Sequence, residues 1–247
     1  MHNIIIRKDL KLKYSLFWIK QAFITFREKP LQFLILGIFN SILTMLPFIG
    51  AFLSPLFAAR FAYCANKVEN HEQLSIGEIF KGLFANRLVL RLAFINFCLS
   101  TVIILAEYFL NIPSESDKFL ATDILLFLLL YIPAILLGIS MWLSPVLCLF
   151  NDDVEPKSAM WLSLQVCFYN IIVLLAFSII IGGISLAIGA PSLLILLKLW
   201  DTFHNIYLMI PVFIVISIIG IVWLTILNIT TYYVYKMIYK KRSVNSD

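Results

Sequence analysis

The chain alternates between long apolar stretches and short charged segments. Six stretches are apolar and long enough to predict membrane spans, at residues 31–47, 48–65, 89–110, 124–150, 171–188 and 206–234, because a bilayer core of about 30 Å needs about 20 apolar residues per helix. Strands of a membrane barrel alternate polar and apolar residues, whereas residues 124–130 are apolar throughout. The pattern predicts an all-α polytopic membrane bundle of about six transmembrane helices with amphipathic interfacial helices.

Residues 12–26 predict the first of these interfacial helices. Apolar side chains recur there at helical spacing, at Leu12, Leu16, Ile19, Phe23 and Phe26. Lys13, Lys20 and Arg27 are available to meet lipid phosphates. Two interpretations stay open: a helix lying on the inner leaflet, or a helix docked on the underside of the bundle.

Two connections between spans carry further helix signals. Ser75 and Glu78 have the spacing of a capping box, and the apolar pattern that follows predicts a helix from Ser75 as far as Phe84. Asn151 to Lys157 precede a second amphipathic stretch, in which Pro156 fits the first helical turn. Both connections are expected on the cytoplasmic side.

Composition and charge set the environment and the orientation. Hydrophobic residues make up 62% of the chain and charged residues 13%, against roughly 45–50% and about 25% in soluble domains. All but two of the 19 Lys and Arg residues fall on one side of the predicted bundle, the exceptions being Lys118 and Lys198. Cytoplasmic loops are enriched in these residues, so we expect a multi-pass membrane protein with both termini in the cytoplasm.

This orientation divides the chain into three parts. Residues 1–30 form a basic amphipathic cytoplasmic segment, residues 31–238 a six-helix transmembrane domain, and residues 239–247 a short basic tail. The net charge of +5 is explained by topology. No basic stripe with interleaved stacking aromatics lies outside the predicted spans, so we expect no nucleic-acid partner.

Two motifs occur twice. Leu53-Ser54-Pro55 is matched by Leu143-Ser144-Pro145, and the pattern F-x-N-x-x-V-L occurs at residues 84–90 and 168–174. Both copies would cross the membrane in the same directions, which predicts a parallel internal repeat. Chance similarity between apolar sequences remains the alternative.

The residues that carry most chemistry are scattered. The four cysteines lack a C-x-x-C spacing, the three histidines lie in separate segments, and Asp152-Asp153 is better explained as an acidic helix cap. We therefore expect no catalytic, cofactor-binding or metal-binding residue, no cofactor and no enzymatic activity.

Polar residues within the spans are the remaining functional candidates. Arg60 and Arg91 are expected to extend toward lipid headgroups. Glu107 is interpreted as a solvated carboxylate at the outer interface, with a role in a solute path as the alternative. Hydrogen bonds between helices are expected from Asn40, Ser41, Thr44 and Asn96. Pro133 and Pro145 are expected to kink the fourth span.

Several short segments resemble a bacterial family of transmembrane proteins. They are residues 17–19 and 26–31, Leu46-Pro47-Phe48-Ile49-Gly50, Leu53-Ser54-Pro55 and residues 74–80. They resemble the uncharacterised BPSS-type six-span family, which is distantly similar to the membrane portion of some glycerophosphodiester phosphodiesterases without their catalytic domain. The resemblance implies an inner-membrane protein of unassigned activity.

The sequence leaves two main functions open. The leading hypothesis is a non-enzymatic scaffold or envelope-maintenance factor that contacts membrane lipids and either a membrane-protein partner or further copies of itself. The alternative is a transporter of small solutes or lipids, favoured by a cavity lined by Glu107, Asn96 or Asn40. A lipid enzyme embedded in the membrane is the third hypothesis.

Overall fold

The protein folds almost entirely into helices. A computed structural model describes residues 4–8, 10–110, 131–203 and 206–241 and is 86% helical, which confirms the all-α class. Five of the described helices are long and apolar enough to cross a membrane, and a sixth, of 15 residues, is apolar but shorter. Lys118 and the predicted start of the fourth span, residues 124–130, lie outside the described residues.

The elements follow the predicted spans closely. In chain order they are β1 (Ile4–Ile6), α1 (Lys13–Glu28), α2 (Pro30–Thr44), α3 (Pro47–Glu69), α4 (Ile76–Phe80), α5 (Arg87–Leu110), α7 (Ile132–Phe150), α8 (Pro156–Tyr169), α9 (Ile171–Phe203), α10 (Ile206–Ile238) and β2 (Tyr239–Lys241). Helices α2, α3, α7 and α8 each begin with a proline in the first turn, where its missing amide hydrogen costs little.

Helix α9 differs from the prediction in its length. The predicted span ends at residue 188, whereas α9 continues through Pro191 to Phe203. A proline inside a membrane helix is tolerated where neighbouring groups satisfy the freed carbonyl groups. Helices α9 and α10 each have 33 residues, which gives each a length of about 50 Å.

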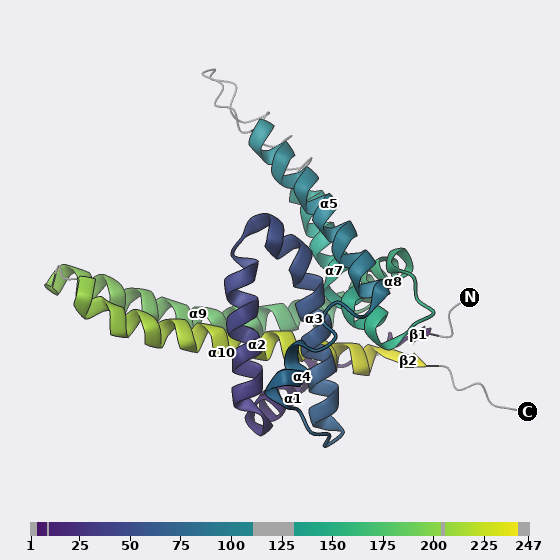
Figure 1. The fold of residues 1–247 in the computed structure, drawn as a ribbon, viewed down its shortest axis with the longest axis horizontal. Coiled ribbons are helices and arrows are strands. Elements are labelled where there is room, and N and C mark those ends of the chain that lie inside the picture. Colours follow the sequence, from purple (N-terminus) through teal and green to yellow (C-terminus); the bar gives the residue numbers. More distant parts are fainter. Residues whose placement is uncertain (1–3, 9, 111–130, 204–205, 242–247) are drawn as a thin grey trace, which may run out of the picture.

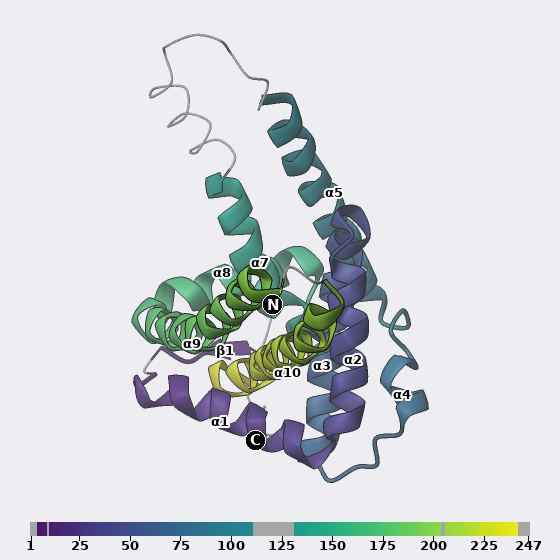
Figure 2. The ribbon, with the colours of Figure 1, turned by 90° about the vertical axis from the view of Figure 1, so that its left-hand side faces the viewer.

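The long helices diverge from a common packed region. Helices α9 and α10 lie side by side and project to one side, while α5 and α7 leave in another direction (Figures 1 and 2). Helix α3 packs against α2, α5, α7 and α10 where these directions meet. The largest fully buried side chains there include Phe57, Phe61, Leu92, Leu143, Leu147 and Ile229.

Helix α1 is docked on the other helices along one face. It buries Ser15, Trp18, Ala22 and Thr25 against α9 and α10. Of the predicted apolar stripe, Leu12, Leu16 and Phe23 are exposed, whereas Ile19 and Phe26 are partly buried against the core. The contacts of α1 therefore fit a docked helix, and the three exposed apolar side chains remain available to lipid.

Helix α4 begins as predicted but ends early. Ser75 Oγ accepts from the Glu78 amide and the Glu78 carboxylate accepts from the Ser75 amide, which completes the capping box. The helix stops at Phe80 because Lys81 is extended and Gly82 has a φ of 84°, a conformation suited to glycine. The prediction that this helix continues to Phe84 was wrong.

The two ends of the chain form a small antiparallel ribbon. Strand β1 pairs with β2, with Ile4 opposite Lys241, Ile5 opposite Lys240 and Ile6 opposite Tyr239. The Arg7 amide continues the pairing by donating to the Ile238 carbonyl oxygen at 2.9 Å. Strand β2 directly follows α10, so the ribbon fixes both ends of the described chain beside the C-terminal end of that helix.

Candidate functional site

The two L-S-P motifs meet at a cavity. Ser54 and Pro55 of α3 and Pro145 of α7 line a space of about 400 Å³, which α10 completes with Asn228 and Thr231. Each proline removes one backbone hydrogen bond from its helix. Ser54, Asn228 and Thr231 contribute polar side chains to a lining that is otherwise mainly apolar, and the cavity lies between the two L-S-P segments.

A second, more apolar cavity adjoins it where α7 and α9 diverge. Its volume is about 490 Å³ and its walls come from α7, α8, α9 and α10. The two cavities share the lining residues Ile139, Trp142 and Thr231. Phe177 closes part of the second cavity and stacks on Trp142 with ring centroids 6.2 Å apart.

Each occurrence of the second repeated motif places an asparagine directly before a helix, although only Asn86 caps its helix through its side chain, by accepting from the amides of Leu88 and Val89. Asn86 directly precedes α5 and Asn170 directly precedes α9. Each asparagine carbonyl oxygen accepts the first helical bond, from the amide of Leu90 or Leu174, at 3.0 Å. The surroundings differ, because α5 packs along α3 whereas α9 packs mainly on α10 and α1. The internal repeat stays a prediction.

The polar residues and prolines singled out within the spans differ in their hydrogen-bond partners and in their positions. Asn96 Nδ2 donates to the Ala51 carbonyl oxygen of α3 at 2.6 Å, which confirms the expected bond between helices. Thr44 Oγ1 instead donates to the Asn40 carbonyl oxygen within its own helix, also at 2.6 Å. Pro133 lies in the first turn of α7, whereas Pro145 lies inside it. The side chain of Glu107 lies outside the described part of the chain.

Arg60 behaves differently from the prediction. Its side chain is buried and donates from Nε to the Ile79 carbonyl oxygen and from Nη2 to the Glu78 carbonyl oxygen. The guanidinium also lies over the Tyr63 ring, 4.3 Å from its centroid. Arg60 therefore fastens α4 to α3, and its charge is directed to protein carbonyl groups rather than to lipid.

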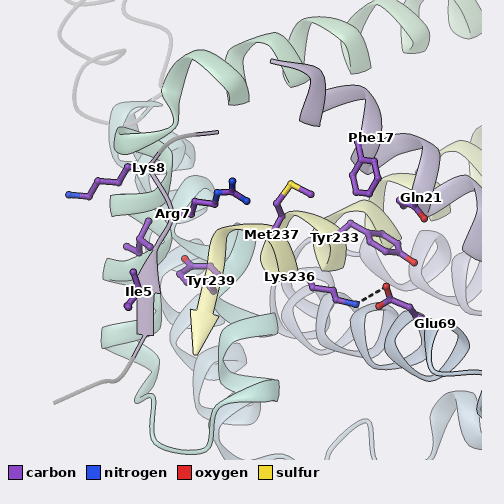
Figure 3. Close-up of a pocket in the computed structure, with 11 residues that line it drawn as sticks. Ile5, Arg7, Lys8, Phe17, Gln21, Glu69, Tyr233, Lys236, Met237 and Tyr239 are labelled. Carbon is purple, nitrogen blue, oxygen red and sulfur yellow. Dashed lines mark ion pairs between the residues drawn. The ribbon is translucent and has the colours of Figure 1, made fainter. Parts of the chain in front are cut away.

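The largest of the cavities described here lies beside the ribbon that joins the two ends of the described chain. We call it the terminal pocket; it has a volume of about 1170 Å³ and lies between β1, α1 and the C-terminal ends of α3 and α10 (Figure 3). Its charged lining residues are Arg7, Lys8, Glu69 and Lys236. Its other lining residues are Ile5, Ile6, Phe17, Gln21, Tyr233, Met237 and Tyr239.

The acidic group of the terminal pocket is engaged within the protein. Lys236 Nζ lies 2.7 Å from Glu69 Oε1 (Figure 3), and the Tyr232 hydroxyl donates to Glu69 Oε2 at 2.6 Å. Both carboxylate oxygens thus have a partner.

The basic groups of the terminal pocket are positioned by the backbone of the ribbon. The Arg7 carbonyl oxygen accepts from Asn170 Nδ2 at 3.1 Å. Lys8 Nζ lies over the ring of Tyr169, 4.0 Å from its centroid. The C-terminal end of α8 thereby holds residues 7 and 8 beside the pocket, and the Lys8 side chain extends away from it (Figure 3).

Sequence analysis did not identify the terminal pocket. Its residues come from both ends of the chain and from α1 and α3, so no local motif joins them. The one available signal was the β-branched run Ile4-Ile5-Ile6, which favours a strand, together with basic residues near both ends.

Within the described residues, no three His, Cys, Asp or Glu side chains come close enough to hold a metal ion. No family model, curated protein or solved structure matches the chain. The resemblance to the BPSS-type family stays a prediction.

Proposed function

We propose that the chain is a multi-pass protein of a bacterial inner membrane with six spans and both termini in the cytoplasm. The ribbon is the observation that carries this topology. Because β1 and β2 pair directly, both ends lie on one side, which requires an even number of crossings. Five helices meet the length and hydropathy needed for crossing, and α2 supplies the sixth.

Helix α2 is the critical member of this topology. Its 15 residues span about 22 Å, less than the bilayer core, and short spans are accommodated by local thinning and by flanking residues. The turn after α2 is then extracytoplasmic, and Met45 in this turn is 80% exposed.

Cysteine labelling tests the topology. With the four native cysteines replaced by serine, Met45→Cys should react with a membrane-impermeant maleimide added outside intact inner membranes. Lys81→Cys, in the cytoplasmic connection, should react only after lysis. Labelling of Met45→Cys only after lysis would contradict the six-span topology.

We further propose that the protein acts without catalysis, as a scaffold or envelope-maintenance factor that makes lateral contacts. The supporting observation is the exposure of α9 and α10: only 17% and 11% of their membrane segments are buried within the chain. Such helices associate with other membrane helices through packing and hydrogen bonds. The proposed partner is another membrane protein or a second copy of this chain.

Site-specific photo-crosslinking tests this role. A photoreactive residue at Leu186 or Val215, both exposed on the projecting helices, should give a discrete protein adduct in native membranes. The same residue at Lys20 of α1, outside the projecting helices, is the control. A monomer without protein adducts, dispersed freely in mild detergent, would rule out the scaffold.

Transport of a lipid or small solute is the second candidate, and the adjoining cavities between α3, α7, α9 and α10 favour it. Gly138 lines the smaller cavity, and a Cβ added there meets no atom within 4 Å, so a larger side chain can be introduced without a clash at its base. Because it occupies space at the cavity wall, Gly138→Phe should slow lipid or solute exchange in proteoliposomes. Gly220→Phe, at an equally open glycine on α10, is the matched control, and equal exchange rates would exclude this route.

A further inference from the structure

A pocket between the starts of α5 and α8 carries charges of both signs. We call it the α5–α8 pocket; its volume is about 530 Å³, and its charged lining residues are Arg91 of α5 and Glu155 and Lys157 at the start of α8. All three are exposed, and none of them forms an ion pair within the described part of the chain. Glu155 does not cap α8 through its side chain either. The pocket therefore offers two cations and one carboxylate to a ligand.

An apolar groove continues from this pocket along α5. Phe94 lines both spaces, and the groove has a volume of about 390 Å³ between α5 and α3. Phenylalanine rings form most of its surface, with Phe97 beside Phe94 on α5 and with Phe48 and Phe52 on α3. Phe94 is 61% exposed and Phe48 is 46% exposed, so the groove is open on its outer side.

Contacts within the protein fix the groove before any ligand binds. Asn96 Nδ2 of α5 donates to the Ala51 carbonyl oxygen of α3 at 2.6 Å. One residue further along each helix, the rings of Phe52 and Phe97 pack edge to face with centroids 6.5 Å apart. Less ordering is needed on binding when the walls of a site are fixed in this way, which favours affinity.

The order of charged and apolar surface along α5 matches that of one membrane leaflet. Arg91 lies in the second turn of the helix, and Phe97 is six residues further along, which is about 9 Å by helical rise. In the topology proposed above, α5 begins on the cytoplasmic side. The charges then lie at the depth of the headgroups of the inner leaflet, and the phenylalanine rings lie deeper, among the acyl chains.

We propose that the α5–α8 pocket and its groove bind one phospholipid of the inner leaflet whose headgroup carries a primary ammonium, as in phosphatidylethanolamine. Arg91 and Lys157 bind its phosphate, for which both side chains are suited. Glu155 accepts hydrogen bonds from its ammonium, and an acyl chain lies along the groove. A choline headgroup has no N–H group to donate to Glu155, and a purely anionic headgroup is repelled by this carboxylate. The assignment to the inner leaflet rests on the proposed topology.

Native mass spectrometry of the full chain in mild detergent tests the choice of headgroup. The protein is offered equal amounts of phosphatidylethanolamine and phosphatidylcholine with the same acyl chains. Phosphatidylethanolamine should be retained about two- to five-fold more, the effect expected of one exposed ion pair. Glu155→Gln should bring this ratio to about one by removing the ion pair. Glu28→Gln, at an exposed carboxylate of α1, is the matched control and should keep the ratio of the parent protein.

Two further variants separate the phosphate contacts from the groove. Arg91→Gln/Lys157→Gln should lower the retention of both lipids about 10- to 30-fold, since each basic residue near a lipid surface contributes about a factor of five. Lys20→Gln/Lys81→Gln removes the same charge from exposed positions elsewhere and should retain both lipids as the parent does. Phe94→Ser should lower the retention of both lipids but keep their ratio, because the groove contacts the acyl chains that they share. The melting temperature of each variant verifies folding.

The proposal is overturned if the parent protein retains the two lipids equally, or if Glu155→Gln keeps the ratio of the parent. A second competition uses phosphatidylglycerol, and its retention above phosphatidylethanolamine by the parent would also overturn the proposal. Each of these failures leaves the topology intact. The topology depends on the labelling of Met45→Cys, and labelling of this variant only after lysis would contradict it whatever lipid is retained.

Discussion

Trp18 shows how one residue attaches the N-terminal helix to the rest of the protein. Its side chain is fully buried, its ring packs edge-on against Phe177 with centroids 5.5 Å apart, and Nε1 donates to Met237 Sδ at 3.3 Å. A single side chain on α1 therefore contacts α9 and α10, the two helices that form the projecting pair.

Replacing Trp18 by alanine should destabilise the protein strongly. The loss of a buried tryptophan typically costs about 3–5 kcal/mol, and we expect a lowered melting temperature in detergent and faster proteolysis of residues 13–28. Phe23→Ala removes an exposed aromatic from the same helix and should change the melting temperature little. Equal effects of the two substitutions would show that α1 is not docked through Trp18.

Cys167 offers a test of burial in α8. Burial raises the pKa of its thiol to about 11, so the reactive thiolate forms only as the pH rises toward that value. At pH 8 we expect alkylation about 10-fold slower than for an ordinary thiol, because the smaller thiolate fraction outweighs the greater nucleophilicity of a more basic thiolate.

The control for this measurement is Lys157→Cys, exposed on the same helix, with the other cysteines replaced by serine. Rates are followed by mass spectrometry from pH 7 to pH 10. The rate for Cys167 should still be rising at the upper limit, whereas the control should level off near pH 9. A plateau for Cys167 near pH 9 would show an unburied thiol.

Helix α4 depends on a contact from outside its own segment. Its capping box gives it a defined start, but a helix of five residues is too short to be stable alone. Arg60 provides the missing support by donating to the carbonyl oxygens of Glu78 and Ile79. The buried cation that α3 presents beside α4 therefore adds to the support that the capping box gives this short helix.

Arg60→Met should release α4 while keeping most of the side-chain volume. Hydrogen bonds from charged donors contribute about 1.5–3 kcal/mol, so amide hydrogen exchange in residues 76–80 should accelerate about 10- to 100-fold. Lys81→Met, exposed next to the helix, should leave exchange unchanged. Unchanged exchange in Arg60→Met would show that the helix is held by other contacts.

Acidic pH should loosen the same helix. The Ser75 amide, and then Lys67, hold the pKa of Glu78 below its ordinary value. The stabilisation from this carboxylate is therefore present above its ordinary pKa and is lost as the pH falls through the lowered value. Replacing Glu78 by glutamine should remove this pH dependence of exchange, after correction for the intrinsic rate.

Sequence patterns predicted the elements that depend on local signals. The spans follow from runs of apolar residues, and the starts of α4 and α8 follow from Ser75 and Pro156. The sequence did not show that α4 ends before Gly82, because the apolar pattern of this segment continues to Phe84. The role of Arg60 was missed because it depends on residues 18 and 19 positions further along the chain.

At the scale of the whole molecule, the terminal ribbon could not be predicted from local signals. Strand β1 has three residues and its partner lies at the opposite end of the chain. Such a short strand is stable only where long-range packing brings its partner to it. The terminal pocket was missed for the same reason, since Arg7 and Lys236 meet only when the ribbon has formed.

A disulfide across the ribbon tests this arrangement. Ile5 and Lys240 are partners in the antiparallel register, and such pairs have Cα separations within the range that a disulfide accepts. With the native cysteines replaced by serine, Ile5→Cys/Lys240→Cys should form an intramolecular disulfide under mild oxidation, identified by peptide mass spectrometry.

Ile4→Cys/Tyr239→Cys is two positions out of register and should form the disulfide much more slowly. Equal rates for the two pairs would contradict the register. Failure of both would place the ends of the chain apart, and with them the even number of membrane crossings.

The ribbon also constrains the order in which the protein can mature. A ribosome produces β1 first and β2 only after more than two hundred further residues, so the first strand has no partner while the helices between the two strands are being made. Residues 4–6 consequently take up their final places only after α10 and the strand that follows it have been synthesised. The terminal pocket is therefore complete only in the fully translated chain, and every shorter intermediate lacks it.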